Sequence, residues 1–147
     1  MINELVVSHN EYRALHGVPP VTWSEKMAGD AQEFAKELAR TGKLGHASKE
    51  DRKYQGENVS RMSKHYKATD AVSFWYAEVD KYDFSSPGFS LECGHFTQVV
   101  WRKTREIGVG CARSEDGDGL VYVVARYWPP GNVTNAFEEN VLPPLSI

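Results

Sequence analysis

Residues 106–128 read EIGVGCARSEDGDGLVYVVARYW, and this stretch decides the fold class of the chain. Its two ends, residues 106–113 and 120–128, are rich in β-branched and aromatic side chains, which favour strands. Between them lies EDGDG at residues 115–119, and Asp-Gly pairs are typical of tight turns between antiparallel strands. We therefore predict a β-hairpin over this stretch.

Helical periodicity dominates the chain before the hairpin. Four segments are predicted to be helices, at residues 1–16, 24–41, 69–82 and 94–102. Ser24 is suited to cap the start of the second segment, and Gly42 to end it. We expect His9 and His16, in the first helix, to be packing or surface residues. Residues 43–67 are predicted to be an irregular loop, and the tail after the hairpin to be extended. Helices followed by a late hairpin indicate an α+β fold, with helices packed on an antiparallel sheet.

Length and composition restrict the organisation further. The 147 residues, 41% hydrophobic and 25% charged, fit one domain over residues 1–147. The net charge of -3 argues against a nucleic-acid partner, although residues 43–67 carry seven Lys and Arg against three Asp and Glu. Two cysteines, Cys93 and Cys111, do not make a disulfide scaffold, and we expect both to be reduced thiols.

Two glutamates and two histidines are the candidate functional residues. Glu78 falls on the margin of the apolar face of the third predicted helix, where a carboxylate needs a charged or hydrogen-bonding partner. His95 lies at the start of the fourth, where the helix dipole favours the neutral imidazole that binds metals. His46 and Glu57 are flanked by small residues that allow close backbone approach. The spacing of the four matches no compact metal motif, so sequence positions alone do not assemble them.

Several motifs across the chain are similar to those of one known family. The segments GHFTQVVW at 94–101 and YWPPGN at 127–132 closely resemble signature segments of the CAP superfamily, also called the SCP or PR-1-like family. The similarity extends to HNEYR at 9–13, GEN at 56–58 and WYAE at 75–78. The ending FEENVLPP, at 137–144, looks most like the Golgi-associated, intracellular branch.

This resemblance implies an α-β-α sandwich, with an antiparallel sheet between helices and a large cleft. In the cleft it implies a tetrad of His46, Glu57, Glu78 and His95. Members of the family can bind a divalent ion, typically zinc, through the two histidines, while the glutamates hold water or orient the imidazoles. Such a site is expected to be weak and to exchange its metal. The other cysteines that usually partner the equivalents of Cys93 and Cys111 are absent.

The resemblance leaves several functions open. The first is a non-enzymatic module that interacts with membranes, anionic lipids or sterol, or with protein partners. The Golgi-associated branch suggests a homodimer. The alternative is a zinc-assisted hydrolase of protease or esterase type, with Glu57 or Glu78 as general base. A glycosidase with the same two carboxylates is a third. The fourth is a purely structural role, in which the tetrad is a buried polar network.

Two cellular locations follow from the sequence. Residues 1–5, MINEL, contain no secretory signal, and position 2 is Ile rather than the Gly that myristoylation requires. We expect an intracellular protein, cytoplasmic or peripheral on Golgi-type membranes. The alternative is an extracellular protein whose signal peptide was removed.

Overall fold

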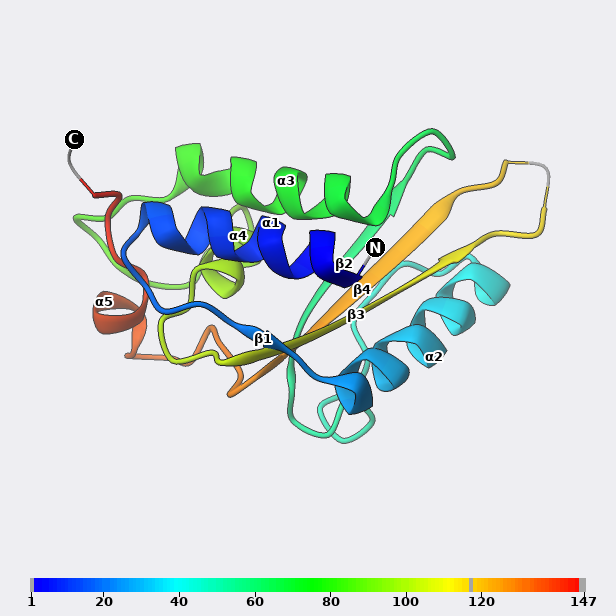
Figure 1. The fold of residues 1–147 in the computed structure, drawn as a ribbon, viewed down its shortest axis with the longest axis horizontal. Coiled ribbons are helices and arrows are strands. Elements are labelled where there is room, and N and C mark those ends of the chain that lie inside the picture. Colours follow the sequence, from blue (N-terminus) through cyan, green and yellow to red (C-terminus); the bar gives the residue numbers. More distant parts are fainter. Residues whose placement is uncertain (1, 117, 146–147) are drawn as a thin grey trace.

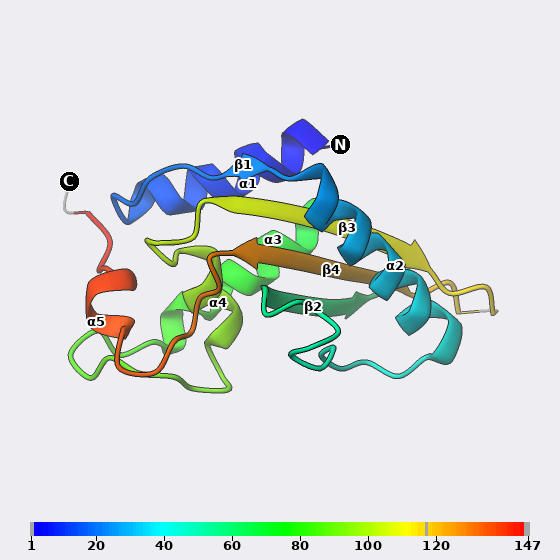
Figure 2. The same ribbon diagram turned by 90° about the horizontal axis from the view of Figure 1, so that it is seen from below.

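A four-stranded mixed sheet lies between two layers of helices in the computed structural model, which describes residues 2–116 and 118–145 (Figures 1 and 2). The helices are α1 (Ile2–Leu15), α2 (Glu25–Thr41), α3 (Ala68–Ala77), the 3-10 helix η1 (Glu78–Lys81), α4 (Gly94–Val99) and α5 (Phe137–Asn140). The strands are β1 (Thr22–Trp23), β2 (Gly56–Met62), β3 (Glu106–Arg113) and β4 (Val121–Trp128), in the sheet order β1-β3-β4-β2. The predicted α+β class and sandwich architecture are confirmed.

The predicted hairpin is the centre of the sheet. Strands β3 and β4 pair antiparallel along their whole length, with Glu106 opposite Trp128 and Arg113 opposite Val121. Of its predicted turn, Gly117 lies outside the described residues. Strand β2 adds antiparallel to β4, and the two-residue β1 adds parallel to β3. The sheet is therefore antiparallel except at this one short edge.

Helix α2 covers one face of the sheet, below it in Figure 1. As predicted, Ser24 caps its start by accepting the Met27 N–H at 3.2 Å, and Gly42 ends it in the left-handed region at φ 71°. The helix buries alanines and a leucine against Val59, Tyr122 and Val124 of the sheet. A Cβ added to Gly108 would lie 2.2 Å from the Ala28 nitrogen, so this close approach requires glycine.

Helices α1, α3 and α4 cover the opposite face and enclose the larger core. Its fully buried aromatic residues include Trp75, Phe96, Trp101 and Tyr127. The helix predicted over residues 69–82 becomes 3-10 at Glu78, and the one predicted over 94–102 ends at Val99. The short α5 lies in the tail that was predicted to be extended.

The prediction of one irregular loop over residues 43–67 is wrong, because β2 lies inside it. The strand contains Glu, Asn, Ser and Arg, so its sequence lacks the apolar pattern of a strand. All seven residues nevertheless pair with β4. This pairing, rather than the local sequence, makes the segment a strand. The strand divides the basic segment into two loops at opposite ends of β2.

Several smaller predictions are also settled. His9 and His16 are buried packing residues, and both cysteines are free thiols. Within residues 2–116 and 118–145, no helix has the length and apolar character needed to cross a bilayer.

Candidate functional site

The first half of the candidate site is the pair His46 and Glu57. Glu57 lies on β2 with its side chain 1% exposed, whereas His46 comes from the α2–β2 loop and is 57% exposed. The His46 Nδ1 atom lies 2.8 Å from Glu57 Oε1, and the Ala47 N–H donates to the same oxygen at 3.1 Å. The loop is therefore held against the strand at the histidine itself.

Arg126 completes the environment of Glu57. It lies opposite Glu57 in the β2–β4 ladder, and its Nε atom donates to Glu57 Oε2 at 2.8 Å. Both side chains are at most 3% exposed. The guanidinium also lies over the Phe34 ring, 5.4 Å from its centroid, and donates to Gln55 Oε1 at 3.4 Å. Both carboxylate oxygens of Glu57 thus have a partner, which a buried charge requires.

The second half is the pair Glu78 and His95. Glu78 stands where α3 becomes η1, and His95 lies in the first turn of α4. Glu78 Oε1 accepts the backbone N–H groups of His95 and Phe96, at 3.0 and 3.2 Å. Its Oε2 atom lies 2.8 Å from His95 Nδ1. The carboxylate therefore holds both the backbone and the ring of His95. His95 is thus the hydrogen-bonding partner that the sequence analysis expected for Glu78.

Asn58 connects the two halves. It follows Glu57 in β2, so their side chains point to opposite faces of the sheet. The Asn58 side-chain amide donates to the His95 carbonyl at 3.1 Å and to the Tyr127 hydroxyl at 3.2 Å. The His46–Glu57 pair is thus on the α2 side of the edge strand, and the Glu78–His95 pair is on the other. Among the described residues, no hydrogen bond joins the two pairs directly.

A buried polar chain continues from Asn58 into the core. The Tyr127 hydroxyl lies 2.9 Å from His9 Nε2, and His9 Nδ1 lies 3.0 Å from the Leu5 carbonyl. Burial lowers the pKa of His9 to about 4 and raises the pKa of Tyr127 above its ordinary value. Both groups are therefore neutral at pH 7. A neutral His9 donates to the Leu5 carbonyl and accepts from the Tyr127 hydroxyl, so both ring nitrogens and that hydroxyl have a partner.

The donor atoms of each His–Glu pair can be compared with those of known metal ligands. A carboxylate only accepts hydrogen bonds, so Nδ1 of His46 and of His95 must carry the hydrogen. In a neutral imidazole the Nε2 atom then holds the lone pair, which is the arrangement of metal-ligating histidines with a carboxylate behind them. The part of the chain that the structure describes contains no group of three or more His, Cys, Asp or Glu suited to a metal. Each His–Glu pair therefore offers one imidazole nitrogen with the chemistry of a metal ligand.

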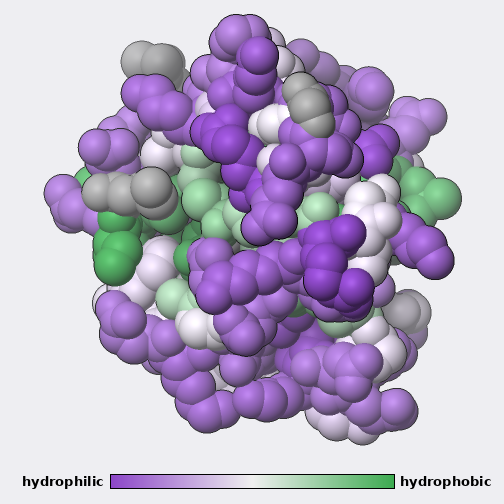
Figure 3. All heavy atoms as spheres, turned by 90° about the vertical axis from the view of Figure 1, so that its right-hand side faces the viewer, coloured by the Kyte–Doolittle hydropathy of each residue, from purple (hydrophilic) through white to green (hydrophobic). Residues whose placement is uncertain are grey.

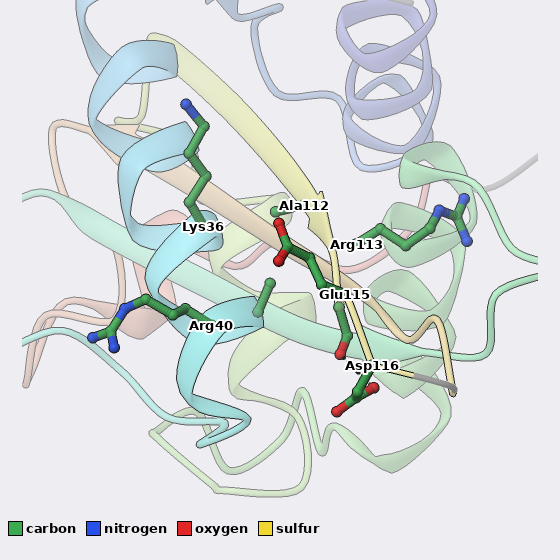
Figure 4. A pocket seen from close by; sticks show the side chains of 8 residues that line it. Lys36, Arg40, Ala112, Arg113, Glu115 and Asp116 are labelled. Carbon is green, nitrogen blue, oxygen red and sulfur yellow. Dashed lines mark hydrogen bonds between the residues drawn. The ribbon is translucent and has the colours of Figure 1, made fainter.

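Surface hollows lie beside the tetrad and away from it. A cavity of about 370 Å³ is bordered by Phe34, Ala47 and Arg126, next to the His46–Glu57 pair. A larger one of about 460 Å³ lies between α2 and the hairpin end, and none of the tetrad residues borders it. Figure 4 shows its Lys36 and Arg40 extending from α2 and Arg113 pointing to the other side of β3. This larger cavity therefore does not mark the candidate site.

Sequence reasoning missed Arg126 and the role of Asn58. A charged residue inside the apolar run of residues 120–127 was a usable signal, because a strand buried on both faces tolerates an arginine only with a partner. Asn58 carried no comparable signal. Its importance comes from its place in the edge strand, which the sequence did not reveal.

Comparisons with known proteins agree with the fold and the motifs. A family model described as "CAP: Cysteine-rich secretory protein family" matches residues 7–127. Human "Golgi-associated plant pathogenesis-related protein 1" is 44% identical over 144 residues, covering 97% of this chain and 92% of that protein. "Pathogenesis-related protein 1A1" of Solanum lycopersicum is 39% identical over 129 residues, covering 85% of this chain and 69% of that protein.

Of solved structures, BmVAL-1 aligns with a TM-score of 0.74 at 23% identity, covering 90% of this chain and 78% of that one. NaASP2, described as a crystal structure with Zn²⁺, aligns with a TM-score of 0.71 at 21% identity, covering 90% and 80%.

Proposed function

Because the chain belongs to the CAP, or cysteine-rich secretory protein, family, we propose that it is a binding module that holds a divalent metal between His46 and His95 and associates with anionic membranes. The resemblance that the sequence motifs carried is thereby confirmed at the level of the family. The metal, the membrane association and the non-enzymatic character are our proposals. Each rests on separate features of the molecule.

The observation that carries the metal proposal is the pairing of each imidazole with a buried or half-buried glutamate. Nδ1 of His46 and of His95 each meets a carboxylate oxygen at 2.8 Å, which leaves Nε2 as the ligand atom. The pairs lie on opposite sides of β2, so they reach a shared ion only around the open edge of that strand. Bound zinc supplies positive charge and open coordination positions for water or a ligand oxygen.

The contacts of the glutamates support positioning rather than catalysis. Glu57 accepts from His46, Ala47 and Arg126, and Glu78 accepts from His95 and from two backbone N–H groups. A general base needs a lone pair aimed at a substrate proton. Carboxylates already engaged in this way are better suited to orient the histidines. We therefore favour a binding module over the zinc-assisted hydrolase, with Glu57 and Glu78 as positioning residues.

The membrane proposal draws on the human relative and on the charge distribution. That relative is named as Golgi-associated, and we propose peripheral association with Golgi-type membranes for this chain. The seven cations between residues 43 and 67 supply a local positive charge on a chain of net charge -3. Basic residues near an anionic bilayer each contribute about 1 kcal/mol.

Calorimetric titration with zinc tests the metal proposal. The wild type is expected to bind one zinc ion, and His46→Ala and His95→Ala are each expected to abolish measurable binding. His65→Ala is the matched control, because His65 is exposed in a loop outside the tetrad. Equal zinc affinity in all four proteins would exclude the site.

Vesicle flotation tests the membrane proposal. Phosphatidylcholine vesicles that contain phosphatidylserine are expected to bind the protein, and pure phosphatidylcholine vesicles are not. Binding must weaken as salt rises, because the attraction is screened. Absence of binding to anionic vesicles at low salt would refute membrane association by this chain alone.

A further inference from the structure

Strand β2 separates the basic segment into two loops with different surroundings. Residues 43–55 precede the strand and residues 63–67 follow it. A seven-residue strand spans about 20 Å, so the two loops lie at opposite ends of one sheet edge, as Figure 1 shows. Because they lie at opposite ends, the two loops are separate candidate surfaces for contact with a membrane. Variants in each loop can be compared.

Two of the four cations in the loop before β2 make contacts within the protein. Lys53 forms an ion pair with Asp30 at 3.2 Å, and Arg52 donates to the carbonyls of Ala47 and Gln55. The same loop also contains two acidic residues, Glu50 and Asp51. Positive and negative charges are therefore interleaved in this loop, although Lys43 and Lys49 stay exposed.

The loop after β2 differs in that its cations are not interleaved with acids and lie beside exposed aromatic rings. Lys64 and Lys67 are exposed, make no ion pair among the described residues, and have no acid between them in the sequence. Between them Tyr66 is 43% exposed and packs edge-to-face against Phe74 of α3, which is 46% exposed, with ring centroids 5.2 Å apart. Lys64, Tyr66, Lys67 and Phe74 form what we call the aromatic–basic patch.

We propose that the aromatic–basic patch is the surface through which the protein docks on an anionic phospholipid bilayer. Charge complementarity selects this occupant, since the two unpaired lysines face the solvent beside a pair of exposed aromatic rings. Aromatic rings settle at the headgroup level of a bilayer, and lysines reach the phosphate groups. The inference rests on the proposed membrane association and names the face that performs it.

The patch is preorganised by contacts with its surroundings. The Arg113 Nη1 atom donates to the Lys64 carbonyl at 3.0 Å, and the Tyr66 N–H donates to the Ser63 carbonyl at 3.1 Å. The Asp70 carboxylate accepts the Lys67 backbone N–H at 2.7 Å, which ties the loop to the start of α3. A loop held in this way loses little conformational entropy on docking. Figure 3 views the right-hand end of Figure 1, where hydrophobic areas interrupt a largely hydrophilic surface.

Two acidic residues near the patch weaken its attraction for anionic lipids. Besides Asp70, Glu4 of α1 lines a cavity of about 260 Å³ together with Tyr66, Lys67 and Arg113. Glu4 opposes the field of the two lysines. Its replacement by glutamine is therefore expected to strengthen vesicle binding about twofold to fivefold.

Flotation of variants with vesicles of phosphatidylcholine and phosphatidylserine tests the proposal. The double change Lys64→Ala with Lys67→Ala is expected to weaken binding about twentyfold, and this loss must shrink as salt rises. Phe74→Ser is expected to weaken binding about tenfold with little dependence on salt, because it removes apolar insertion. Far-ultraviolet circular dichroism confirms that each variant is folded.

The matched control is Lys43→Ala with Lys49→Ala, two exposed lysines of the other loop. This variant removes the same charge and is expected to change binding less than about twofold. If both lysine doubles weaken binding equally, or Phe74→Ser binds like wild type, the patch is refuted while membrane association stands. If the wild type itself fails to bind anionic vesicles, the proposed function fails and the patch with it. Wild-type binding to an acidic polypeptide but not to vesicles would also overturn the patch as a lipid surface.

Discussion

Arg126 lies directly opposite Glu57 across the β2–β4 ladder, and its Nε atom donates to Glu57 Oε2 at 2.8 Å in a setting where both side chains are almost fully buried. The other oxygen of the same carboxylate holds His46 and the Ala47 N–H. One buried ion pair therefore connects the sheet to the histidine of the candidate metal site.

Arg126→Met is expected to lower the free energy of unfolding by about 3–5 kcal/mol, because Glu57 is left buried without its cation. Urea unfolding measures this. Lys36→Met is the control, since it removes an exposed cation from the Glu33 pair and is expected to cost less than about 1 kcal/mol. Similar losses of unfolding free energy in both variants would show that the burial of the Glu57–Arg126 pair does not determine its contribution to stability.

Asn58→Ala is expected to lower the free energy of unfolding by about 1–3 kcal/mol and to weaken zinc binding, because the His95 carbonyl and the Tyr127 hydroxyl both lose a donor. Ser60→Ala, two residues along the same face of β2, is the control for changes to the strand itself. Unchanged zinc affinity in the Asn58 variant would mean that the two His–Glu pairs are positioned independently.

Stability is expected to fall on mild acidification because of His9. Burial holds its pKa at about 4 in the folded protein, below its ordinary value of 6.5, so the unfolded chain binds the proton more readily. The stabilisation is complete above about pH 6.5 and is lost as the pH falls toward about 4, at up to about 1.4 kcal/mol per pH unit.

His9→Gln removes this titration, whatever its effect on stability at pH 7. Urea unfolding at several pH values is therefore expected to give a flatter stability curve for the variant than for the wild type. Burial also lowers the pKa of His16, so His16→Gln is expected to remove a further share of the slope. Parallel curves for wild type and His9→Gln would contradict the assignment of a neutral, buried His9.

Glu78→Gln is expected to weaken zinc binding about 10- to 100-fold, as loss of an orienting carboxylate behind a ligating histidine typically does. Calorimetric titration measures this, with Glu92→Gln as the control because Glu92 is an exposed acid just before α4. Unchanged zinc affinity in the Glu78→Gln variant would mean that the Glu78 carboxylate does not support zinc binding by His95.

The helices and the hairpin were predictable because local signals determine them. Ser24 and Gly42 delimit α2 through their own capping contacts, and the β-branched and aromatic side chains of β3 and β4 suit strands that are largely buried. Strand β2 was not predictable in this way. Its polar sequence becomes a strand only through pairing with β4, which lies about 60 residues later in the chain.

In the candidate site, too, only residues with a local sequence signal were predictable. Glu78 was recognisable as a carboxylate in need of a partner, and the structure supplies that partner in His95. Glu57 gave no such local signal, since its partners His46 and Arg126 come from a loop and from β4. The motif resemblance was needed to assemble the four candidates into one site. That one metal ion joins them stays a prediction.

X-ray absorption spectroscopy of the zinc-loaded protein tests most directly whether the His–Glu pairs on the two sides of β2 serve one ion. Two imidazole nitrogens at about 2.0–2.1 Å from zinc, with oxygen atoms in the remaining positions, are expected. A spectrum with one imidazole or none would contradict a shared site of His46 and His95.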